Sequence, residues 1–242
     1  MMWRTHAASG LAAGAVLLAV VPVDGLADQL GFVAACGGAA LLPDWDHPSS
    51  SVAVMWGPIS RTVHRVVAVV FRGHRGGTHD WLLAPLVFAA LAYAATLHPA
   101  ATAAATAVAV GATLRALAFV IPGHKEKSWP VNLAVSVAAG WWIALAAGYP
   151  WWLPVAYAVG VLAHIAGDAV TRSSVPRPFS WLDGRQPGDD YAGTPFTTGA
   201  WYETWLVFPA LVICAVVALS VNSPDVRAYI TPVLTAVGAA LS

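Results

Sequence analysis

The sequence has few charged residues and little cysteine, and both shortages restrict what the chain can be. Only 10% of its 242 residues are charged and 58% are hydrophobic, whereas water-soluble domains carry about 25% charged residues. A soluble fold with so little polar surface would aggregate, so we expect an integral membrane protein. The formal net charge of zero argues against direct nucleic-acid binding through a basic field. Cys36 and Cys214 lie in apolar runs and form no CxxC pair, which argues against a disulfide framework or a thiolate zinc site.

Apolar stretches long enough, or nearly so, to cross a membrane recur along the chain. A transmembrane helix needs roughly 20 residues, with about 17 as the lower limit. Seven stretches and a weaker eighth meet this description: 7–23, 27–43, 80–98, 100–121, 131–148, 152–171, 203–221 and 226–241. We therefore expect an all-α fold, a polytopic transmembrane helical bundle of seven or eight helices that forms a single membrane-embedded domain over 1–242. The first stretch also fits a cleavable signal peptide, whose removal would take away His6.

Basic residues are unevenly shared between the two sides of this predicted bundle. The loops opposite the segment 44–79 hold only Arg227. Ten basic residues fall on the side that carries this segment: Arg4, Arg61, Arg65, Arg72, Arg75, Lys125, Lys127, Arg172, Arg177 and Arg185. Short cytoplasmic loops are enriched in Lys and Arg, so this side is expected to face the cytoplasm. Arg115, inside the fourth stretch, is expected to snorkel to that interface; binding of a lipid or substrate head group is the alternative.

Two polar segments on the cytoplasmic side separate the apolar stretches. Residues 59–72, after Gly57-Pro58, place valines on one helical face and basic residues on the other. This spacing predicts a short amphipathic helix that lies on the bilayer. The second segment, 172–202, is rich in Pro, Gly and Asp and is expected to form a lid loop.

Histidines and aspartates from distant parts of the chain fall at the cytoplasmic ends of the apolar stretches. Imidazole and carboxylate together are the ligand set of zinc and of harder divalent metals. Eight residues share this position: His6, Asp44, Asp46, His47, His74, His79, His164 and Asp168. A metal site at the membrane surface is therefore the leading hypothesis. His64, His98 and His124 are expected to lie outside it.

Three local patterns support this hypothesis. In residues 41–48, Pro43 ends a helix, and in the extended segment that follows Asp44 and Asp46 would point to the same side. Solvated acids at a helix end would give the same sequence pattern. In residues 73–80, a Gly-Gly pair lets a tight loop turn two histidines inward; Thr78 can cap the next helix, and Arg75 can meet an anionic phosphate. His164 and Asp168 are spaced i to i+4 and share one helical face, as metal ligands or as a hydrogen-bonded pair.

The same three motifs resemble one bacterial family. They read LLPDWDHPSSSV at 41–52, GHRGGTHD at 73–80 and LAHIAGDAVTRSSVPRPFSW at 162–181. In order and spacing they are similar to the inner-membrane-associated, metal-dependent hydrolases, a family also described as LexA-binding. Asp80 stands where that family usually has serine, and we expect its carboxylate to orient His79 or to alter the metal preference. The histidine and aspartate pattern is more weakly similar to zinc-dependent phospholipase C and related single-strand nucleases.

The resemblance implies a multi-pass protein of the inner membrane and a divalent metal cofactor, zinc or manganese, as one or two ions. We expect six residues to coordinate the metal directly: His6, Asp44, His74, His79, His164 and Asp168. Asp46 would bridge two metal ions or act as a general base. His47 would hold a metal-coordinating side chain in place, and Arg75 would stabilise negative charge that develops during the reaction.

The leading functional hypothesis is hydrolysis of a phosphoester or another amphiphilic substrate, such as a lipid, at the cytoplasmic membrane face. The alternative is a non-catalytic protein, stabilised by a metal, that binds a regulatory partner protein. Ion transport is disfavoured because the polar residues gather at one face and do not cross the bilayer.

Overall fold

Helices make up almost all of the ordered secondary structure. The computed structural model describes residues 1–118, 128–146, 150–183 and 194–241, and these residues contain no β-strand, only an isolated bridge between Thr171 and Phe196. The α-helices are α1 (Trp3–Leu17), α2 (Leu26–Ala39), α3 (Ser51–Val54), α4 (Pro58–Val70), α5 (Leu83–Thr96), α6 (Pro99–Ala116), α7 (Trp129–Ala146), α8 (Leu153–Ala169), α9 (Phe208–Asn222) and α10 (Pro224–Leu241). The all-α prediction is confirmed for this part of the chain.

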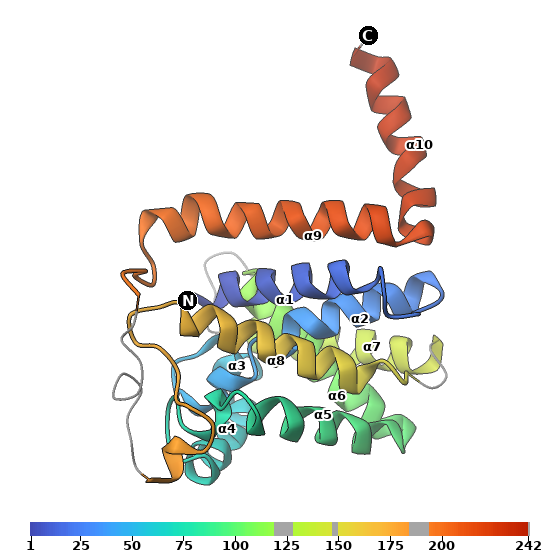
Figure 1. The fold of residues 1–242 in the computed structure, drawn as a ribbon. Coiled ribbons are helices and arrows are strands. Elements are labelled where there is room, and N and C mark those ends of the chain that lie inside the picture. The colour runs from blue at the N-terminus through green and yellow to red at the C-terminus, as the bar shows by residue number, and fades with distance from the viewer. Residues whose placement is uncertain (119–127, 147–149, 184–193, 242) are drawn as a thin grey trace.

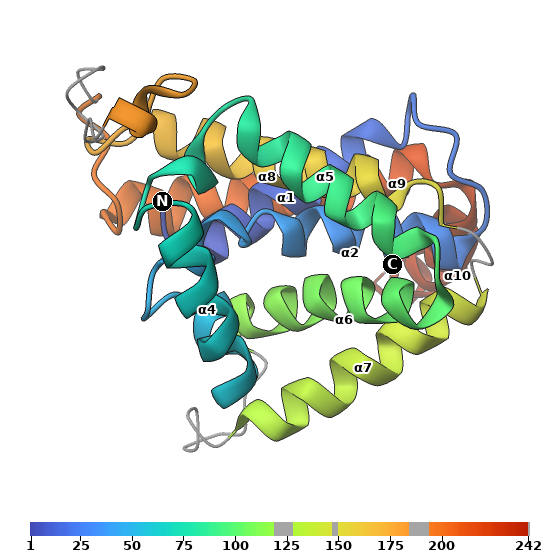
Figure 2. The same ribbon diagram turned by 90° about the horizontal axis from the view of Figure 1, so that it is seen from below.

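The helix α2 lies at the centre of the bundle. It packs against α1, α6 and α8, while α5 packs on α8 and α7 on α6. The helix α9 runs alongside α1, and α10 projects away from the other helices (Figure 1). At the end of the bundle where the N-terminus lies, α4 runs across the direction of α6 (Figure 2) and packs on α3 and on the short 3-10 turn η1 (Pro43–Asp46). A second 3-10 turn, η2 (Gly77–His79), lies at the same end.

Two glycines allow α1 and α8 to approach α2 very closely. A Cβ atom added to Gly10 on α1 would lie 2.4 Å from the carbonyl oxygen of Cys36, and one added to Gly160 on α8 would lie 2.3 Å from the same oxygen. Small residues at helix crossings are a common packing solution in membrane proteins. His6 and His164 lie four residues, about one turn, from these glycines. The close crossings therefore bring both imidazoles to the same end of α2.

Three helices in the described part of the chain are long and apolar enough to cross a membrane. They are Leu26–Asp46, Trp129–Ala146 and Glu203–Asn222; the apolar helices Leu83–Thr96 and Leu153–Ala169 are shorter. Seven or eight such helices are not shown. The first predicted stretch forms a helix of only 15 residues, α1, and the threonines and Arg115 of α6 lower the hydropathy of that helix.

Of the two predicted polar segments, the structure describes the first completely and the second only in part. The helix predicted over 59–72 is present as α4, with valines such as Val66 and Val70 exposed on its surface. The predicted lid is described over 172–183 and 194–202 only. His124, Lys125, Lys127 and Arg185 lie outside the described residues.

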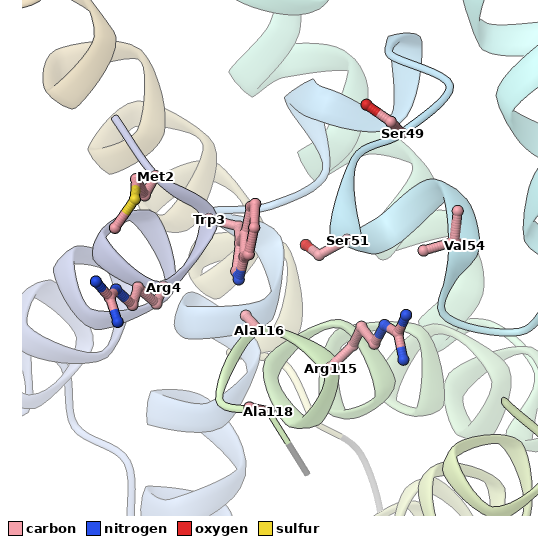
Figure 3. Close-up of a pocket in the computed structure, with 9 residues that line it drawn as sticks. All are labelled: Met2, Trp3, Arg4, Ser49, Ser51, Val54, Arg115, Ala116 and Ala118. Carbon is pink, nitrogen blue, oxygen red and sulfur yellow. The ribbon is translucent and has the colours of Figure 1, made fainter. Parts of the chain in front are cut away.

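The end of the bundle that carries α4 is hollowed. A cavity of about 350 Å³ opens between the start of α1, the α3 segment and the end of α6 (Figure 3). Trp3 and Ser51 lie on facing sides of it, and Arg115 lines it from α6.

Candidate metal centre

The six side chains predicted to bind metal gather at this end of the bundle, in two adjoining groups. His6, His164 and Asp168 form one group, and Asp44, His74 and His79 form the other. Within each group the potential ligand atoms all lie within 4.8 Å of one another. The elements that supply them are α1, η1, η2 with the loop before it, and α8. Residues that are up to 162 positions apart in the chain, His6 and Asp168, thus meet in one place.

Four ligand atoms, two from each group, have the spacing of a single coordination shell. The Nε2 atoms of His79 and His164 are 3.1 Å apart. Each of these nitrogens lies 3.7 Å from Oδ1 of Asp44 and 3.7 Å from Oδ2 of Asp168. A tetrahedral zinc ion with metal–ligand distances of about 2.0–2.1 Å has ligand–ligand edges of about 3.3–3.4 Å. Five of the six edges of this set, at 3.1–3.7 Å, are close to that value.

Hydrogen bonds at the far side of both rings direct the Nε2 lone pairs toward each other. His164 Nδ1 lies 2.8 Å from the carbonyl oxygen of Ala40 and donates to it. Thr78 Oγ1 donates to Asp46, so it is free to accept from His79 Nδ1 at 3.0 Å. These partners assign the proton of each neutral ring to Nδ1. Two lone pairs that face each other at 3.1 Å repel unless a proton or a metal ion lies between them.

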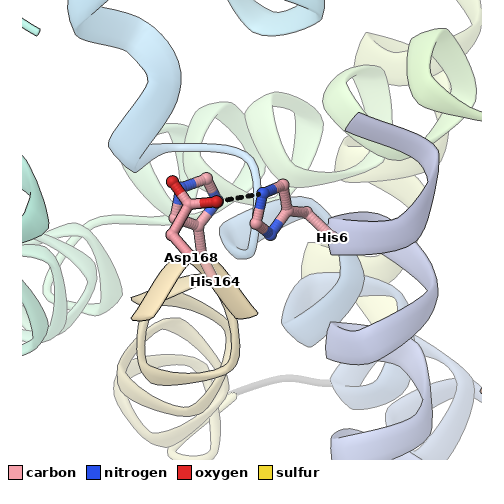
Figure 4. Close-up of side chains that lie close together, drawn as sticks. All are labelled: His6, His164 and Asp168. Atoms are coloured by element: carbon pink, nitrogen blue, oxygen red, sulfur yellow. Dashed lines mark ion pairs between the residues drawn. The ribbon is translucent and has the colours of Figure 1, made fainter. Parts of the chain in front are cut away.

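His6 extends this set from α1. Its ring stacks on that of His164, with centroids 3.8 Å apart and planes inclined by 19°. Its Nε2 lies 3.2 Å from Oδ1 of Asp168 (Figure 4). The Nδ1 atom is buried and has no hydrogen-bond partner among the described residues. A buried nitrogen without a partner costs free energy, which a bound cation or an ordered water would relieve.

Asp46 supports the loop that carries the histidines. Its Oδ1 lies 2.8 Å from His74 Nδ1, and its Oδ2 accepts from the backbone N–H of Arg75 at 3.0 Å and from Thr78 Oγ1 at 2.5 Å. Both oxygens are therefore engaged by residues 74–78. The side chain is completely buried, whereas that of His74 is 39% exposed. Asp46 is placed to hold the loop rather than to reach a substrate.

Arg75 contacts the carboxylate of Asp168. Its guanidinium lies 2.7 Å from Oδ2 of Asp168 and also donates to the carbonyl of Ser174. The α-amino group of Met1 lies 2.5 Å from Oδ1 of Asp168. Two cations thus compensate the buried Asp168. The backbone of Arg75 has a φ of 59°, a left-handed conformation that is strained for a residue other than glycine.

The hydrogen-bond partners of Asp80 and Thr78 differ from those expected from the sequence. Asp80 accepts from the backbone N–H groups of Leu82 and Leu83, both at 2.8 Å, and so caps α5. Its other oxygen accepts from the backbone of Phe179 and from Trp181 Nε1, at 2.5 and 3.1 Å. It thus ties the lid segment to the start of α5 and does not contact His79. Thr78, expected to cap that helix, donates to Asp46.

Burial and hydrogen bonding act in opposite directions on the pKa of His79. Burial alone would lower the pKa, but the carboxylates of Asp44 and Asp46 outweigh it and raise the pKa of His79 to about 9. Without a metal ion, His79 therefore carries a second proton at neutral pH, on Nε2 toward His164. A metal ion and this proton would compete for the same position.

A second cavity, of about 310 Å³, opens onto the cluster. Asp44, His47, His74, Arg75 and Asp168 line it, so both groups of ligands are reached from solvent. The His47 ring meets that of His74 edge to face at 4.8 Å, and its Nδ1 lies 3.1 Å from Ser49 Oγ. His64 and His98 lie outside the cluster, as predicted: His64 Nδ1 bonds the carbonyl of Trp45, and His98 caps α6.

Two contributors were missed by reasoning from the sequence. The carbonyl of Ala40 orients His164, and no side-chain pattern marks a backbone group. Glu203 is fully buried and accepts from the backbone N–H groups of Met2 and Gly199, at 2.7 and 2.6 Å. A single acid at the start of an apolar run of twenty residues was the available signal.

One protein-family model matches nearly the whole chain. The chain matches the model of the YdjM inner membrane protein family over residues 1–241. It belongs to that family. No curated protein and no solved structure matches the chain. The description of the YdjM family supports location in the inner membrane, and it mentions neither hydrolysis nor LexA.

Proposed function

We propose that this YdjM-family protein is a membrane-embedded, metal-dependent hydrolase that acts on a phosphoester of an amphiphilic substrate. His79, His164, Asp44 and Asp168 would hold a divalent cation, zinc or manganese, and His6 and His74 offer donors for a second ion. The observation that carries the proposal is the pair of Nε2 atoms 3.1 Å apart, each 3.7 Å from a carboxylate oxygen of Asp44 and from one of Asp168. When bound, the cation would polarise a phosphoryl oxygen and lower the pKa of a water ligand.

The other polar residues have distinct parts in this proposal. Arg75, at the wall of the cavity, would stabilise negative charge that develops on the substrate while it neutralises Asp168. His47 also lines the cavity and is the group that can move a proton there. Asp46, with both oxygens engaged, would position the loop of residues 74–79 and not act as a base.

The proposal also includes the side of the membrane on which the centre lies and the kind of substrate that reaches it. The distribution of basic residues favours a multi-pass protein with this centre on the cytoplasmic side. The exposed valines of α4, beside the centre, favour a substrate that is itself anchored in the lipid.

A second function is favoured by one observation. Two histidines and two aspartates can complete the four-coordinate shell of zinc, and closed shells are typical of structural sites. The metal would then only fix the loop of residues 74–79 to the helix ends, and the cytoplasmic face would bind a regulatory protein partner, as the LexA-binding resemblance implies.

Metal content and hydrolysis, measured on the same preparations, separate these functions. The full chain is purified in detergent, loaded with Zn²⁺ or Mn²⁺ and analysed by mass spectrometry, as wild type and as His164→Ala and Asp44→Ala. His98→Ala, which removes an exposed histidine far from the centre, is the matched control. Each preparation is then assayed with bis(4-nitrophenyl) phosphate and with phosphatidylglycerol in mixed micelles.

We expect stoichiometric metal and hydrolysis in the wild type and in His98→Ala, and the loss of both in the two other variants. Stoichiometric metal without hydrolysis of either substrate would contradict the enzyme and support the structural site. Full metal content in His164→Ala or Asp44→Ala, or none in the wild type, would overturn the metal centre itself.

A further inference from the structure

The surface of α4 is divided into three lengthwise stripes, because residues spaced i, i+4 and i+7 lie on one side of a helix. Three residues form the inner stripe, which is buried or half-buried: Ser60, His64 and Val67. Four residues form an apolar stripe that is 37–60% exposed: Ile59, Val63, Val66 and Val70. Two exposed arginines form a basic stripe: Arg61 and Arg65. At about 100° per residue, the basic stripe lies nearly opposite the apolar one.

This pattern fits the surface of an anionic membrane. A helix with one apolar and one basic side lies in the plane of the interface, with the apolar side among the acyl chains. The helix α4 contains no acidic residue, and within the described residues neither Arg61 nor Arg65 lies in an ion pair. The cytoplasmic leaflet carries anionic lipids that attract such arginines. The helix also runs across the direction of α6 (Figure 2), as expected for a helix in the membrane plane beside spanning helices.

The inner stripe of α4 is bonded to the turn that carries two aspartates of the metal centre. Trp45 stands between Asp44 and Asp46 in η1. Its Nε1 donates to the carbonyl oxygen of Ser60 at 3.0 Å, and its own carbonyl oxygen accepts from His64 Nδ1 at 2.9 Å. The position of α4 therefore fixes the main chain between the two carboxylates.

By contrast, few contacts hold α4 to the rest of the protein. Of the residues of this helix, only Ser60 is buried. Segments with few buried contacts open locally at a low cost in free energy. A surface that binds α4 only in its closed position would stabilise that position, and with it the bonds to Trp45.

We propose that α4 docks on the anionic head-group layer of the inner membrane, and that docking raises the affinity of the centre for its metal ion by fixing η1. The apolar stripe would enter the acyl region, and Arg61 and Arg65 would meet lipid phosphates. Docking is independent of hydrolysis, whereas its effect on metal affinity rests on the proposed function.

The first test places a fluorophore on the apolar stripe of the full chain in lipid nanodiscs. Val66→Cys is labelled with nitrobenzoxadiazole in a Cys214→Ser background, since the remaining Cys36 is buried. The reference is Val216→Cys on the apolar helix α9, because Val216 is 57% exposed and Val66 is 58% exposed. Discs of phosphatidylcholine, with and without phosphatidylglycerol of the same acyl chains, contain a doxyl-labelled lipid as quencher. Thermal unfolding of each variant shows whether it keeps its fold.

With phosphatidylglycerol, we expect the doxyl lipid to quench the label at position 66 as strongly as the label at position 216; without it, quenching at position 66 should be weaker. The double variant Arg61→Gln/Arg65→Gln should shift the docking equilibrium about 25-fold toward the free position, since each arginine near an anionic surface contributes about fivefold. Arg61→Lys/Arg65→Lys, which keeps both charges, should dock like the wild type. So should Arg172→Gln, which removes an exposed arginine outside α4.

Equal quenching at position 66 in the two kinds of disc, or unchanged quenching in the double glutamine variant, would overturn the proposal. A label at position 66 that neither the doxyl lipid nor iodide in the water quenches would overturn it in favour of a contact with a second copy of the chain.

The second test measures the zinc affinity of the unlabelled protein in the same discs, by competition with a fluorescent chelator. We expect zinc to bind about fivefold more tightly or better with phosphatidylglycerol, within the usual range for coupled sites. This difference should be absent in the double glutamine variant. His64→Leu, which removes the bond to Trp45, should dock normally yet also lose the difference.

Docking with the same zinc affinity in both kinds of disc would overturn the coupling to the centre. A wild type that binds no zinc in either disc would contradict the proposed function as well, and the quenching at position 66 would still decide whether α4 docks.

Discussion

The imidazole of His79 points its Nε2 at that of His164 across 3.1 Å, with each ring held from behind by a hydrogen bond at Nδ1. The two residues are 85 positions apart in the chain. Since each ring has its far nitrogen engaged, neither can turn away without losing a buried hydrogen bond. Whatever lies between the two nitrogens, proton or metal ion, is held by both.

Metal uptake should release protons. The pKa of His79 is raised to about 9, so Zn²⁺ must displace a proton from this ring at neutral pH. We expect the zinc affinity of chelator-treated protein to rise with pH up to about pH 9. Calorimetry in buffers of different ionisation enthalpy measures the proton count. Zinc binding without proton release between pH 7 and 8 would mean that His79 is not a ligand.

The same titration should affect the stability of the chelator-treated protein. Because the folded-state pKa of His79 lies above its ordinary value near 6.5, its protonation stabilises the fold below pH 6.5, and this contribution is lost as the pH rises through about 9. Thermal unfolding in detergent across this range should show the decline. His79→Gln should flatten it, and His98→Ala should not.

The substitution Asp46→Asn should weaken metal binding without abolishing it. An amide has only one accepting oxygen, so it could not accept all the hydrogen bonds from His74, Arg75 and Thr78. The loss of partners behind metal ligands typically costs 10–100-fold in affinity. Competition with a fluorescent zinc chelator measures this change. Asp183→Asn, an exposed acid of the lid, is the control. An unchanged affinity would remove Asp46 from the support of the centre.

The substitution Asp80→Ser should release the lid segment from α5. Serine can still cap the helix, but it is too short to reach Phe179 and Trp181 as well. We expect faster chymotryptic cleavage after Phe179, which is exposed, with metal content unchanged. A cleavage rate equal to that of the wild type would show that other contacts, such as those of Arg72 with the carbonyl of Leu182 and of Arg75 with the carbonyl of Ser174, hold the lid without Asp80.

The substitution Gly160→Leu should force α8 away from α2, since even a Cβ atom there would lie 2.3 Å from a carbonyl oxygen. Overpacking of this kind costs about 1–3 kcal/mol, and it would also move His164. We expect a lower unfolding temperature together with lower metal content. Ala166→Leu, on the exposed face of the same helix, should change neither.

Much of the candidate centre could be predicted because its chemistry is local in the sequence. His164 and Asp168 share a face by helical spacing alone, and the glycines beside His74 and His79 indicated a tight loop. The hydrophobic pattern likewise predicted an all-α protein. The convergence of His6 with α8 was expected from membrane topology, because both lie at the same ends of their helices.

The remainder depends on tertiary packing, which residue type does not reveal. The carbonyl of Ala40 became a partner of His164 only because Gly160 allows α8 to touch α2. Asp80 was assigned to His79 because the two are adjacent, whereas its partners Phe179 and Trp181 come from the lid about a hundred residues later. Seven or eight spans are not shown, because hydropathy does not reveal where a helix such as α1 ends, and only three described helices are long and apolar enough to cross a membrane.

The distribution of the ligands along the chain has a consequence for biosynthesis. Asp44 and His79 leave the ribosome well before His164 and Asp168. At about 5–20 residues per second, the 162 residues from His6 to Asp168 take roughly 8–32 s to translate. During that interval the early histidines and aspartates exist without their partners from α8. The centre can close only after α8 has been synthesised, so in the proposed function metal acquisition would be a late event, and nascent chains that stop before α8 would be open to quality control.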